Sequence, residues 1–318
     1  MKKMALILAI AALSSTLAGC NHHVSLSPSN TITHPQGTTE VHLNPANPVI
    51  FDFGTLDTMD ALGVTGATCL TKTGLTKIGL AKIGLAKKSI PSYLAQYNND
   101  NVTNVGNMKQ PDMQAVRDLK PQLIVITGRQ SKSYEELSRI APTINMSIDS
   151  KDYLNSFKKN VLTIGQIFDK TPVAESRLAD LDKKIADLKT KAVASGKTAM
   201  VLVHYNGKLS ASTTNGYAAI IHQVLGVKKA DANQQEARQP ATPEYIAAKN
   251  PDIIYIVDRN EAIGDGKIDH KLMEEKKIKK TSAYRNGKII YLKPDLWYLS
   301  GGGLESLSLQ LDEASSAL

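Results

Sequence analysis

Two arginines stand at equivalent points of two similar stretches of this sequence. Residues 112–130 read DMQAVRDLKPQLIVITGRQ and residues 242–260 read TPEYIAAKNPDIIYIVDRN. Each is typical of a capped short helix followed by a proline and a buried parallel strand. Arg129 and Arg259 both come eight residues after that proline. Guanidinium groups stay charged and direct forked donors at anionic oxygens. The pair predicts an anion-binding cleft at the carboxyl ends of two sheets, although each arginine alone could form a surface ion pair within its own lobe.

The stretch DLWYLSGGGLES, residues 295–306, holds the only tryptophan of the chain, Trp297, beside Tyr298 and three glycines. Two interpretations are open. In one, Trp297 fills a gap in the core, and the glycines Gly301 to Gly303 form a turn before a last helix. In the other, the aromatic pair walls a binding pocket and the glycines let the backbone turn away from it. The choice depends on what the rest of the chain places opposite.

The length of the chain indicates two lobes around these residues. About 270 residues follow residue 44, which is more than one compact core usually holds. We therefore expect an α/β protein with two doubly wound lobes, an N-terminal lobe at residues 45–150 and a C-terminal lobe at residues 197–318.

Residues 151–196 should form the helical connection between the lobes. After Thr171-Pro172, apolar residues recur at helical spacing and the run closes at Gly196; the apolar positions are Leu178, Leu181, Ile185 and Leu188. The pattern is too short to favour a coiled coil with another chain, so we expect this long amphipathic helix to pack along its own two lobes.

The beginning of the chain predicts export. Residues 1–20, MKKMALILAIAALSSTLAGC, have two lysines, an apolar run and small residues, as a secretory signal peptide does. The end, LAGC, resembles the lipobox of bacterial lipoproteins, in which Cys20 would carry the lipid. Residues 21–44 contain no aromatic residue and are rich in polar residues and proline, so we expect a flexible tether to a membrane surface.

Composition excludes several classes of protein. Cys69 is the only other cysteine, so no internal disulfide is expected once Cys20 is lipidated. The 38 basic and 30 acidic residues favour an anionic ligand or surface, but no nucleic-acid motif is present, so nucleic acid is not an expected partner. The seven histidines have no zinc-site spacing, although His22-His23 could touch a metal; His222 reads as structural. A pentad repeat at residues 71–88 reads as a local duplication without an assigned function.

Several blocks together resemble the periplasmic ferric-siderophore-binding lipoproteins, in particular the catecholate-type receptors of Gram-negative bacteria. These blocks are FDFGTLDTMDALGV, ITGRQSKSYEELSRIAPTI, IIHQVLG, NPDIIYIVDRN and IIYLKPDLWYLSGGGLESL. The resemblance implies a class III periplasmic binding protein fold, in which one rigid helix joins two lobes. It also implies a monomer without catalytic activity or intrinsic cofactor, lipid-anchored in the periplasm. Such a protein takes ferric iron as a siderophore complex and delivers it to an ABC permease with its ATPase.

The resemblance also suggests roles for residues of the cleft. Arg129 and Arg259 would face the anionic complex, and Tyr298 could bind iron directly where the siderophore leaves coordination positions empty. Phenolate oxygen is a hard donor that suits ferric iron, and Trp297 would wall the pocket. Arg238 stands near the place of a histidine that completes the iron shell in some relatives, so it could supply a third cation instead.

Three further positions depart from or match the family pattern. Tyr217 replaces a family arginine and could stack on a catechol ring, donate a hydrogen bond or pack under its loop. Permease docking in the family uses one carboxylate on each lobe; Glu244 matches the C-terminal position, whereas its N-terminal equivalent here is Gln114. Haem or cobalamin binding by the same fold is the alternative function. An exported hydrolase is disfavoured because no nucleophile elbow or HExxH motif occurs.

Overall fold

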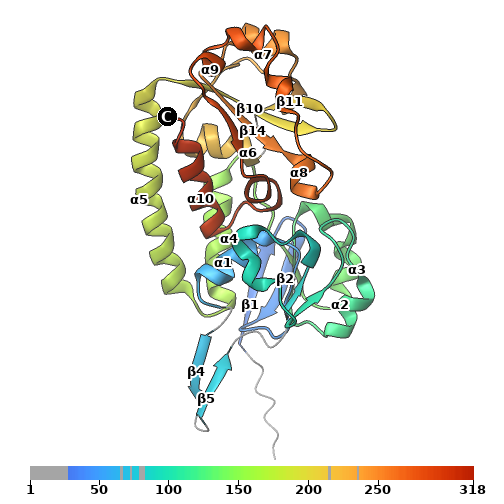
Figure 1. The fold of residues 1–318 in the computed structure, drawn as a ribbon. Coiled ribbons are helices and arrows are strands. Elements are labelled where there is room, and N and C mark those ends of the chain that lie inside the picture. The colour runs from blue at the N-terminus through green and yellow to red at the C-terminus, as the bar shows by residue number, and fades with distance from the viewer. Residues whose placement is uncertain (1–27, 65–66, 72–73, 79–82, 214–215, 235) are drawn as a thin grey trace, which may run out of the picture.

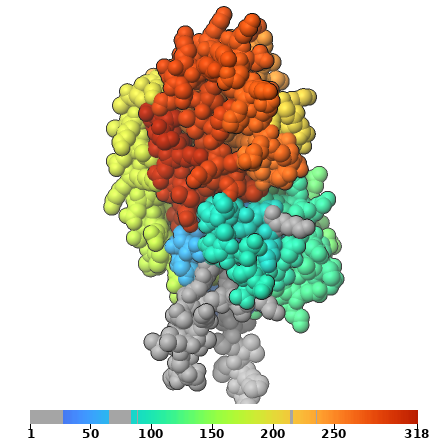
Figure 2. All heavy atoms as spheres, in the orientation of Figure 1, coloured from blue at the N-terminus to red at the C-terminus, as the bar shows by residue number. Residues whose placement is uncertain are grey.

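The computed structural model describes residues 28–64, 67–71, 74–78, 83–213, 216–234 and 236–318. Two α/β lobes stack end to end, and one long helix runs along the side of both (Figure 1). In the space-filling view the C-terminal lobe, in orange and red, rests directly on the teal part of the N-terminal lobe (Figure 2). The predicted fold class, two α/β lobes with a helical spine, is confirmed.

The N-terminal lobe is built on a five-stranded parallel sheet with the order β7-β6-β3-β8-β9. Its strands are short and almost entirely buried, as expected for a sheet covered on both faces. They are β3 (Val49–Ile50), β6 (Ile83–Leu85), β7 (Val102–Asn104), β8 (Ile124–Ile126) and β9 (Thr143–Asn145). The helices of this lobe are α1 (Phe53–Ala61), α2 (Met113–Leu119) and α3 (Tyr134–Ser138), with 3₁₀ turns at Lys87–Ser89, Ser92–Tyr97 and Gly128–Ser133. Because the strand order reverses at β3 and β8, a crevice is expected beyond their carboxyl ends.

The C-terminal sheet is mixed rather than wholly parallel. Its main path is β13-β11-β10-β14-β15, and β12 pairs with the start of β10. The strands are β10 (Thr198–Tyr205), β11 (Lys208–Ser212), β12 (Lys228–Lys229), β13 (Arg238–Pro240), β14 (Ile253–Asp258) and β15 (Ile289–Leu292). An Asn206-Gly207 turn, with φ of 50° and 71°, reverses the chain and makes β11 antiparallel to β10.

Short helices surround this sheet. They are α6 (Gly216–Ala219), which continues into a π-helical turn at Ile220–Val224, α7 (Pro243–Lys249), α8 (Arg259–Ile263) and α9 (Ser282–Arg285). Further 3₁₀ turns lie at His270–Met273 and Ile278–Lys280. After β15 the chain makes a second π-helical turn, Asp295–Leu299, and ends in α10 (Leu304–Ser315).

The connecting segment forms two helices, α4 (Tyr153–Ile167) and α5 (Thr171–Ser195). The predicted long amphipathic helix is α5, which ends at Gly196 in the left-handed conformation. Its apolar positions Leu178, Leu181 and Ile185 are buried in the core that both lobes share. The helix therefore packs on its own chain, along α4 and α10 (Figure 1).

The internal repeat has the same backbone construction in both lobes. Asp112 caps α2 and Thr242 caps α7, each by accepting a hydrogen bond from the backbone three residues later. Both helices end in a left-handed residue, Lys120 in the first copy and Asn250 in the second. Each copy then enters a buried strand of its sheet, β8 or β14. The arginines therefore leave equivalent strands at equivalent ends.

The prediction of a flexible tether is wrong from residue 29 onward. Strands β1 (Ser29–His34) and β2 (Gly37–His42) form an antiparallel hairpin. Ile32 and Val41 on its inner face join the main core, and the Thr39 hydroxyl donates to the carbonyl of Thr143 on β9. The hairpin buries only two apolar side chains, and its other contacts with the lobe are polar or come from His34, whose ring packs on that of Tyr134. This explains why its polar composition read as linker. The signal peptide, Cys20 and His22-His23 lie outside the described residues.

The pentad repeat falls largely on a second hairpin. Strands β4 (Ala67–Thr71) and β5 (Gly74–Ile78) pair antiparallel, and the ribbon projects from the N-terminal lobe (Figure 1). The last part of the repeat runs through β6 into the 3₁₀ turn Lys87–Ser89, so the described part of the duplication covers strand residues and the start of one short turn. No helix among the described residues is long and apolar enough to cross a membrane.

Candidate functional site

A cavity of about 470 Å³ lies between the two lobes, where the strand order of the N-terminal sheet reverses. We call it the interlobe cavity. Both lobes line it, and so does the segment that joins β15 to α10; the lining includes Asp52, Thr127, Gly128, Arg129, Met146, Ser147, Ile148, Tyr153, Gly216, Tyr217, Ile220, Arg238 and residues 297–302. Five of the six residues predicted for ligand binding line this cavity, and the sixth, Arg259, touches one of them.

Arg129 enters the site from the N-terminal lobe. It lies in the 3₁₀ turn after β8, which is fixed because Gln130 folds back on Thr127 and accepts its backbone N–H at 3.0 Å. The Arg129 guanidinium donates through Nη2 to the carbonyl oxygen of Tyr298 at 2.8 Å. Its carbon Cζ lies 5.6 Å from the centroid of the Tyr298 ring. Arg129 therefore contacts the opposite lobe.

Arg259 enters from the C-terminal lobe as the first residue of α8. Its Nε donates to the phenol oxygen of Tyr298 at 2.6 Å, and its Cζ lies 3.5 Å from the centroid of the Tyr205 ring. Among the described residues, neither Arg129 nor Arg259 forms an ion pair with an acidic side chain. The alternative of two separate surface ion pairs is therefore wrong: the arginines meet at one tyrosine.

A buried carboxylate fixes the backbone of Arg259. Asp258 caps α8 by accepting the backbone N–H of Asn260 at 3.0 Å, and it also accepts that of Ile268 at 2.6 Å. Nδ1 of His204 on β10 lies 2.8 Å from Oδ1 of the same carboxylate. Both side chains are buried, with exposed fractions of 4% and 5%. Charged hydrogen bonds of this kind are among the stronger ones in proteins. The start of α8 is thus a rigid support for Arg259.

Tyr217 and Arg238 complete the C-terminal side. The ring of Tyr217 lies 6.4 Å from that of Tyr298 at a tilt of 33°, and burial raises the pKa of the Tyr217 phenol to about 12. Arg238 is exposed at the cavity rim, at the start of the edge strand β13. Two arginines, Arg129 and Arg238, therefore line the cavity, and Arg259 is hydrogen-bonded to the lining residue Tyr298. The phenol rings of Tyr217 and Tyr298 lie beside each other on the same lining.

Trp297 borders the interlobe cavity, but its indole is fully buried. The indole N–H donates to the carboxylate of Glu313 on α10 at 2.7 Å. In the π-helical turn Asp295–Leu299 the side chains of Leu296, Trp297 and Leu299 point into the core. Trp297 is therefore a core residue at the border of the cavity, as the first sequence interpretation expects, and its part in ligand binding stays a prediction. Tyr298 is the partly exposed member of the pair.

The three glycines allow the two lobes to approach closely. A Cβ atom on Gly54 of α1 would lie 2.4 Å from the carbonyl oxygen of Gly301, and one on Gly303 would lie 2.1 Å from a carboxylate oxygen of Asp57. Gly301 and Gly302 also have φ of 117° and 81°, which favours glycine. A side chain at Gly54 or Gly303 would push α10 away from α1.

The close approach places a buried carboxylate at the start of α10. Asp57 accepts the backbone N–H of Ser306 at 2.9 Å and that of Glu305 at 3.0 Å. The phenol of Tyr93 donates to it at 3.2 Å. Gly303, the N-cap residue of α10, has no side chain of its own to do this. We call this contact between Asp57 and the first turn of α10 the interlobe cap.

Sequence reasoning missed several residues of the site. Asp52 lines the cavity at the end of β3 and caps α1 through the backbone N–H of Thr55 at 2.9 Å. Burial raises the pKa of its carboxyl group. Tyr205 ends the apolar run TAMVLVHY, so the rule that selected the arginines, side chains at the carboxyl ends of buried strands, would have selected it too.

The predicted docking residues lie outside the cavity lining. Glu244, in the first turn of α7, pairs with Lys277 at 2.7 Å, and both side chains are more than half exposed. Gln114, in the first turn of α2, donates from its amide to Asp118 at 2.8 Å. The two positions are equivalent in the repeat, but their part in permease docking stays a prediction.

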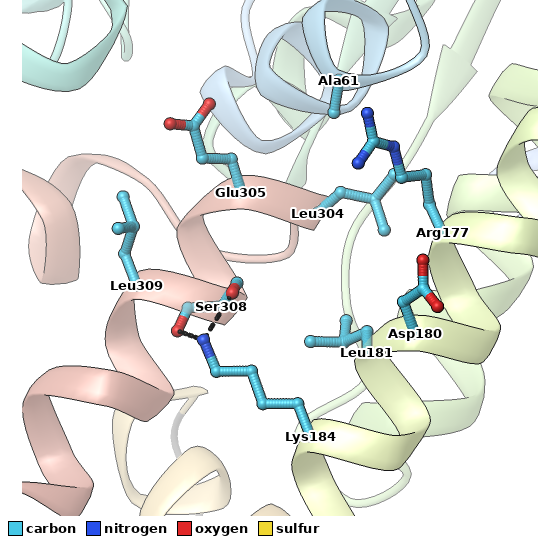
Figure 3. Close-up of a pocket in the computed structure, with 9 residues that line it drawn as sticks. All are labelled: Ala61, Arg177, Asp180, Leu181, Lys184, Leu304, Glu305, Ser308 and Leu309. Atoms are coloured by element: carbon cyan, nitrogen blue, oxygen red, sulfur yellow. Dashed lines mark hydrogen bonds between the residues drawn. The ribbon is translucent and has the colours of Figure 1, made fainter.

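A second cavity, of about 390 Å³, lies between α5 and α10 (Figure 3). Its lining includes Arg177, Lys184, Leu304 and Glu305. Lys184 is already bound to Ser308 and Asp312 at 2.7 Å each. Because this cavity contains no predicted site residue, the interlobe cavity is the stronger candidate. Among the described residues, no group of three or more His, Cys, Asp and Glu side chains could hold a metal ion.

Comparisons with known proteins agree with this architecture. A model of the periplasmic binding protein family matches residues 70–296. The petrobactin-binding protein YclQ of Bacillus subtilis is 36% identical over 329 residues, covering 100% of this chain and 99% of that protein. The crystal structure of YclQ has a TM-score of 0.83 at 38% identity, over 92% of this chain and 99% of that one.

Two other solved structures have the same fold. The iron uptake ABC transporter substrate-binding protein PiuA of Streptococcus pneumoniae has a TM-score of 0.80 at 34% identity, over 92% of this chain and 100% of that one. The periplasmic catecholate-siderophore binding protein VctP of Vibrio cholerae has a TM-score of 0.79 at 26% identity, over 91% and 100%. The family match and the YclQ similarity cover most of the chain, and on this evidence the protein belongs to the periplasmic binding protein family.

Proposed function

We propose that this protein is the substrate-binding lipoprotein of an ABC importer and that it captures a ferric siderophore of the catecholate type in the interlobe cavity. One observation carries the proposal: Arg129 and Arg259, from opposite lobes, converge on Tyr298 at the cavity. The relatives support the ligand class, because their names include a petrobactin-binding protein, an iron uptake substrate-binding protein and a catecholate-siderophore binding protein.

The charge of the site suits such a ligand. A ferric tris-catecholate carries three negative charges, and Arg129, Arg259 and Arg238 supply three cations that do not titrate in the physiological range. Two of them are already oriented by hydrogen bonds to Tyr298, so less side-chain entropy is lost when an anion binds. The rings of Tyr217 and Tyr298 offer aromatic faces to catechol groups.

Tyr298 has a second part in the proposal. Its phenol oxygen accepts a hydrogen bond from Arg259, and the residue lines the interlobe cavity. A phenolate could fill a coordination position that a tetradentate siderophore leaves open on the iron. A hexadentate siderophore would leave no coordination position for Tyr298, whereas a tetradentate one would. The effect of replacing Tyr298 on the affinity for each kind of complex can be measured.

Lipidation of Cys20 would anchor the protein, as a monomer, to a membrane in the periplasm. Permease docking would use Glu244 and the surface around Gln114. Because Glu244 is paired with Lys277, the docking partner would have to compete with that exposed ion pair, which is weak.

The test is a titration followed by the fluorescence of Trp297, the only tryptophan, which borders the cavity. The ligands are an iron(III) tris-catecholate, an iron(III) bis-catecholate, haem and cobalamin, each with the wild type and with Tyr298→Phe. We expect the tightest binding for a ferric catecholate. If the wild type binds the bis-catecholate more tightly than the tris-catecholate and Tyr298→Phe loses this preference, Tyr298 is a ligand of the iron. Binding of haem or cobalamin alone would refute the proposal.

A further inference from the structure

The turn between β10 and β11 holds an exposed aromatic ring against the cleft arginine of the C-terminal lobe. Tyr205 is the last residue of β10, and 41% of its surface is exposed. The Cζ atom of Arg259 lies 3.5 Å from the centroid of its ring, which is a stacked cation–π contact. Hydrogen bonding to Arg259, and then its positive charge, lower the pKa of the Tyr205 phenol.

The position of this ring is fixed by the backbone around it. Asn206 and Gly207 form the left-handed hairpin turn, and Tyr205 pairs with Lys208 across it. The backbone N–H of Asn206 donates to the side chain of Asn260 on α8 at 3.1 Å. The turn and the start of α8 are thus tied together, so Tyr205 and Arg259 keep their relative position.

Arg259 is consequently held by two tyrosines at once. The Tyr205 ring covers one face of the guanidinium, while the Tyr298 phenol accepts from Nε at 2.6 Å. This leaves the side of the guanidinium that faces away from the Tyr205 ring for a ligand. For comparison, Cζ of Arg129 lies 5.6 Å from the centroid of the Tyr298 ring. That contact is looser than the one of 3.5 Å between Arg259 and Tyr205. An arginine side chain that is already ordered loses less rotamer freedom when it binds an anion.

We propose that Tyr205 is a positioning residue of the ligand site: its ring fixes the orientation of the Arg259 guanidinium and thereby sets the affinity for an anionic chelate. This inference rests on the proposed function. It predicts that removing the whole ring of Tyr205 weakens binding more than removing only its hydroxyl, although the hydroxyl also bonds to Arg259, because the cation–π contact needs only the aromatic face.

The experiment measures the dissociation constant of an iron(III) tris-catecholate for the full mature chain in detergent. Tyr205→Ser should weaken binding about threefold to thirtyfold, the range of one cation–π contact, and Tyr205→Phe should stay within about twofold of the wild type. Tyr284→Ser is the matched control. The ring of Tyr284 also lies near a cation, with its centroid 5.7 Å from Nζ of Lys279. Lys279 does not line the interlobe cavity, whereas Arg259 contacts the lining residue Tyr298, so the loss of the Tyr284 ring should leave binding unchanged.

A double-mutant cycle separates positioning from a general structural effect. Once Arg259 is replaced by alanine, removing the Tyr205 ring should have almost no further effect on binding. Wild-type affinity in Tyr205→Ser would overturn the inference, and so would fully additive losses in the cycle. Equal weakening by Tyr205→Phe and Tyr205→Ser would also overturn it, because the hydroxyl and not the ring would then be the important group.

A second readout needs no ligand. The ultraviolet titration of the wild type minus that of Tyr205→Phe isolates the Tyr205 phenol, and its pKa should rise when Arg259 is replaced by alanine. If this rise occurs and the wild type binds no ferric complex, the contact is real but the proposed function has failed, and the inference about affinity fails with it. If the wild type binds and Arg259→Ala leaves the phenol pKa unchanged, only the inference about Tyr205 fails.

Discussion

Replacing Asp57 by alanine should weaken the junction between the lobes more than an ordinary helix cap weakens a protein. The carboxylate is fully buried on α1, yet the two backbone N–H groups that it accepts belong to α10, about 250 residues later in the chain. Because the N-cap residue of α10 is Gly303, that position has no side chain that could accept these N–H groups instead. The interlobe cap therefore links a local helix end to the tertiary arrangement of the lobes.

The expected magnitude follows from these contacts. Loss of a helix N-cap costs about 1 kcal/mol, within a range of about 0.5–2. Each buried donor left without a partner costs about 1–3 kcal/mol more, and these costs do not add fully. We expect Asp57→Ala to lower the free energy of unfolding by about 3 kcal/mol.

Urea unfolding of the wild type and the variant measures this difference. Asp112→Ala is a matched control, because Asp112 also caps a helix through two backbone N–H groups, both at 3.1 Å, but is exposed and acts within one lobe. It should cost about 1 kcal/mol. Equal losses in the two variants would refute the reasoning that the interlobe cap is special.

The same carboxylate makes a prediction about pH. Burial raises the pKa of Asp57 to about 7 from its ordinary value of 3.8, against the lowering effect of its hydrogen bonds. Between these two pKa values, Asp57 is protonated in the folded protein and ionised in the unfolded chain. The stability that this proton contributes is complete below the unfolded pKa and is lost as the pH rises through the folded pKa. Asp57→Asn cannot ionise, so its stability relative to the wild type should increase between about pH 4 and about pH 7. Parallel stability curves over that range would show that Asp57 has an unshifted pKa.

Two further predictions concern the cleft and the glycines. Arg129→Ala and Arg259→Ala should each lose about 1.5–3 kcal/mol of ferric catecholate binding, as expected for charged hydrogen bonds, whereas Lys277→Ala, outside the cavity lining, should lose little in the same titration; equal losses in all three would contradict the cleft model. Gly303→Ala should destabilise the protein by about 3 kcal/mol in urea unfolding, since its Cβ would lie 2.1 Å from the carboxylate of the interlobe cap. Gly128→Ala is the control, because its nearest contact would be an ordinary 3.7 Å, and a similar loss there would mean that the close approach at Gly303 is unimportant.

Part of the site could be predicted because it rests on local rules that a sequence displays. The two copies of the cap, helix, proline and strand pattern placed Arg129 and Arg259 at equivalent strand ends, and the backbone has that construction. The helix after Thr171 could be predicted from apolar spacing and a closing glycine, which depend on neighbours only a few residues apart. The hairpin at residues 29–42 could not, because two buried apolar side chains and one buried histidine on a polar ribbon give almost no periodic signal.

What the sequence determined by itself was therefore the pair of lobes, the spine and the residues with charge and aromatic character at their ends. The tertiary structure decided how those residues meet. It turned Trp297 into the core and Tyr298 toward both arginines, placed Tyr205 under Arg259, and brought Asp57 to a helix that starts about 250 residues later. These contacts join segments far apart in the chain, and they depend on packing and close backbone approach, which no local pattern of residues records.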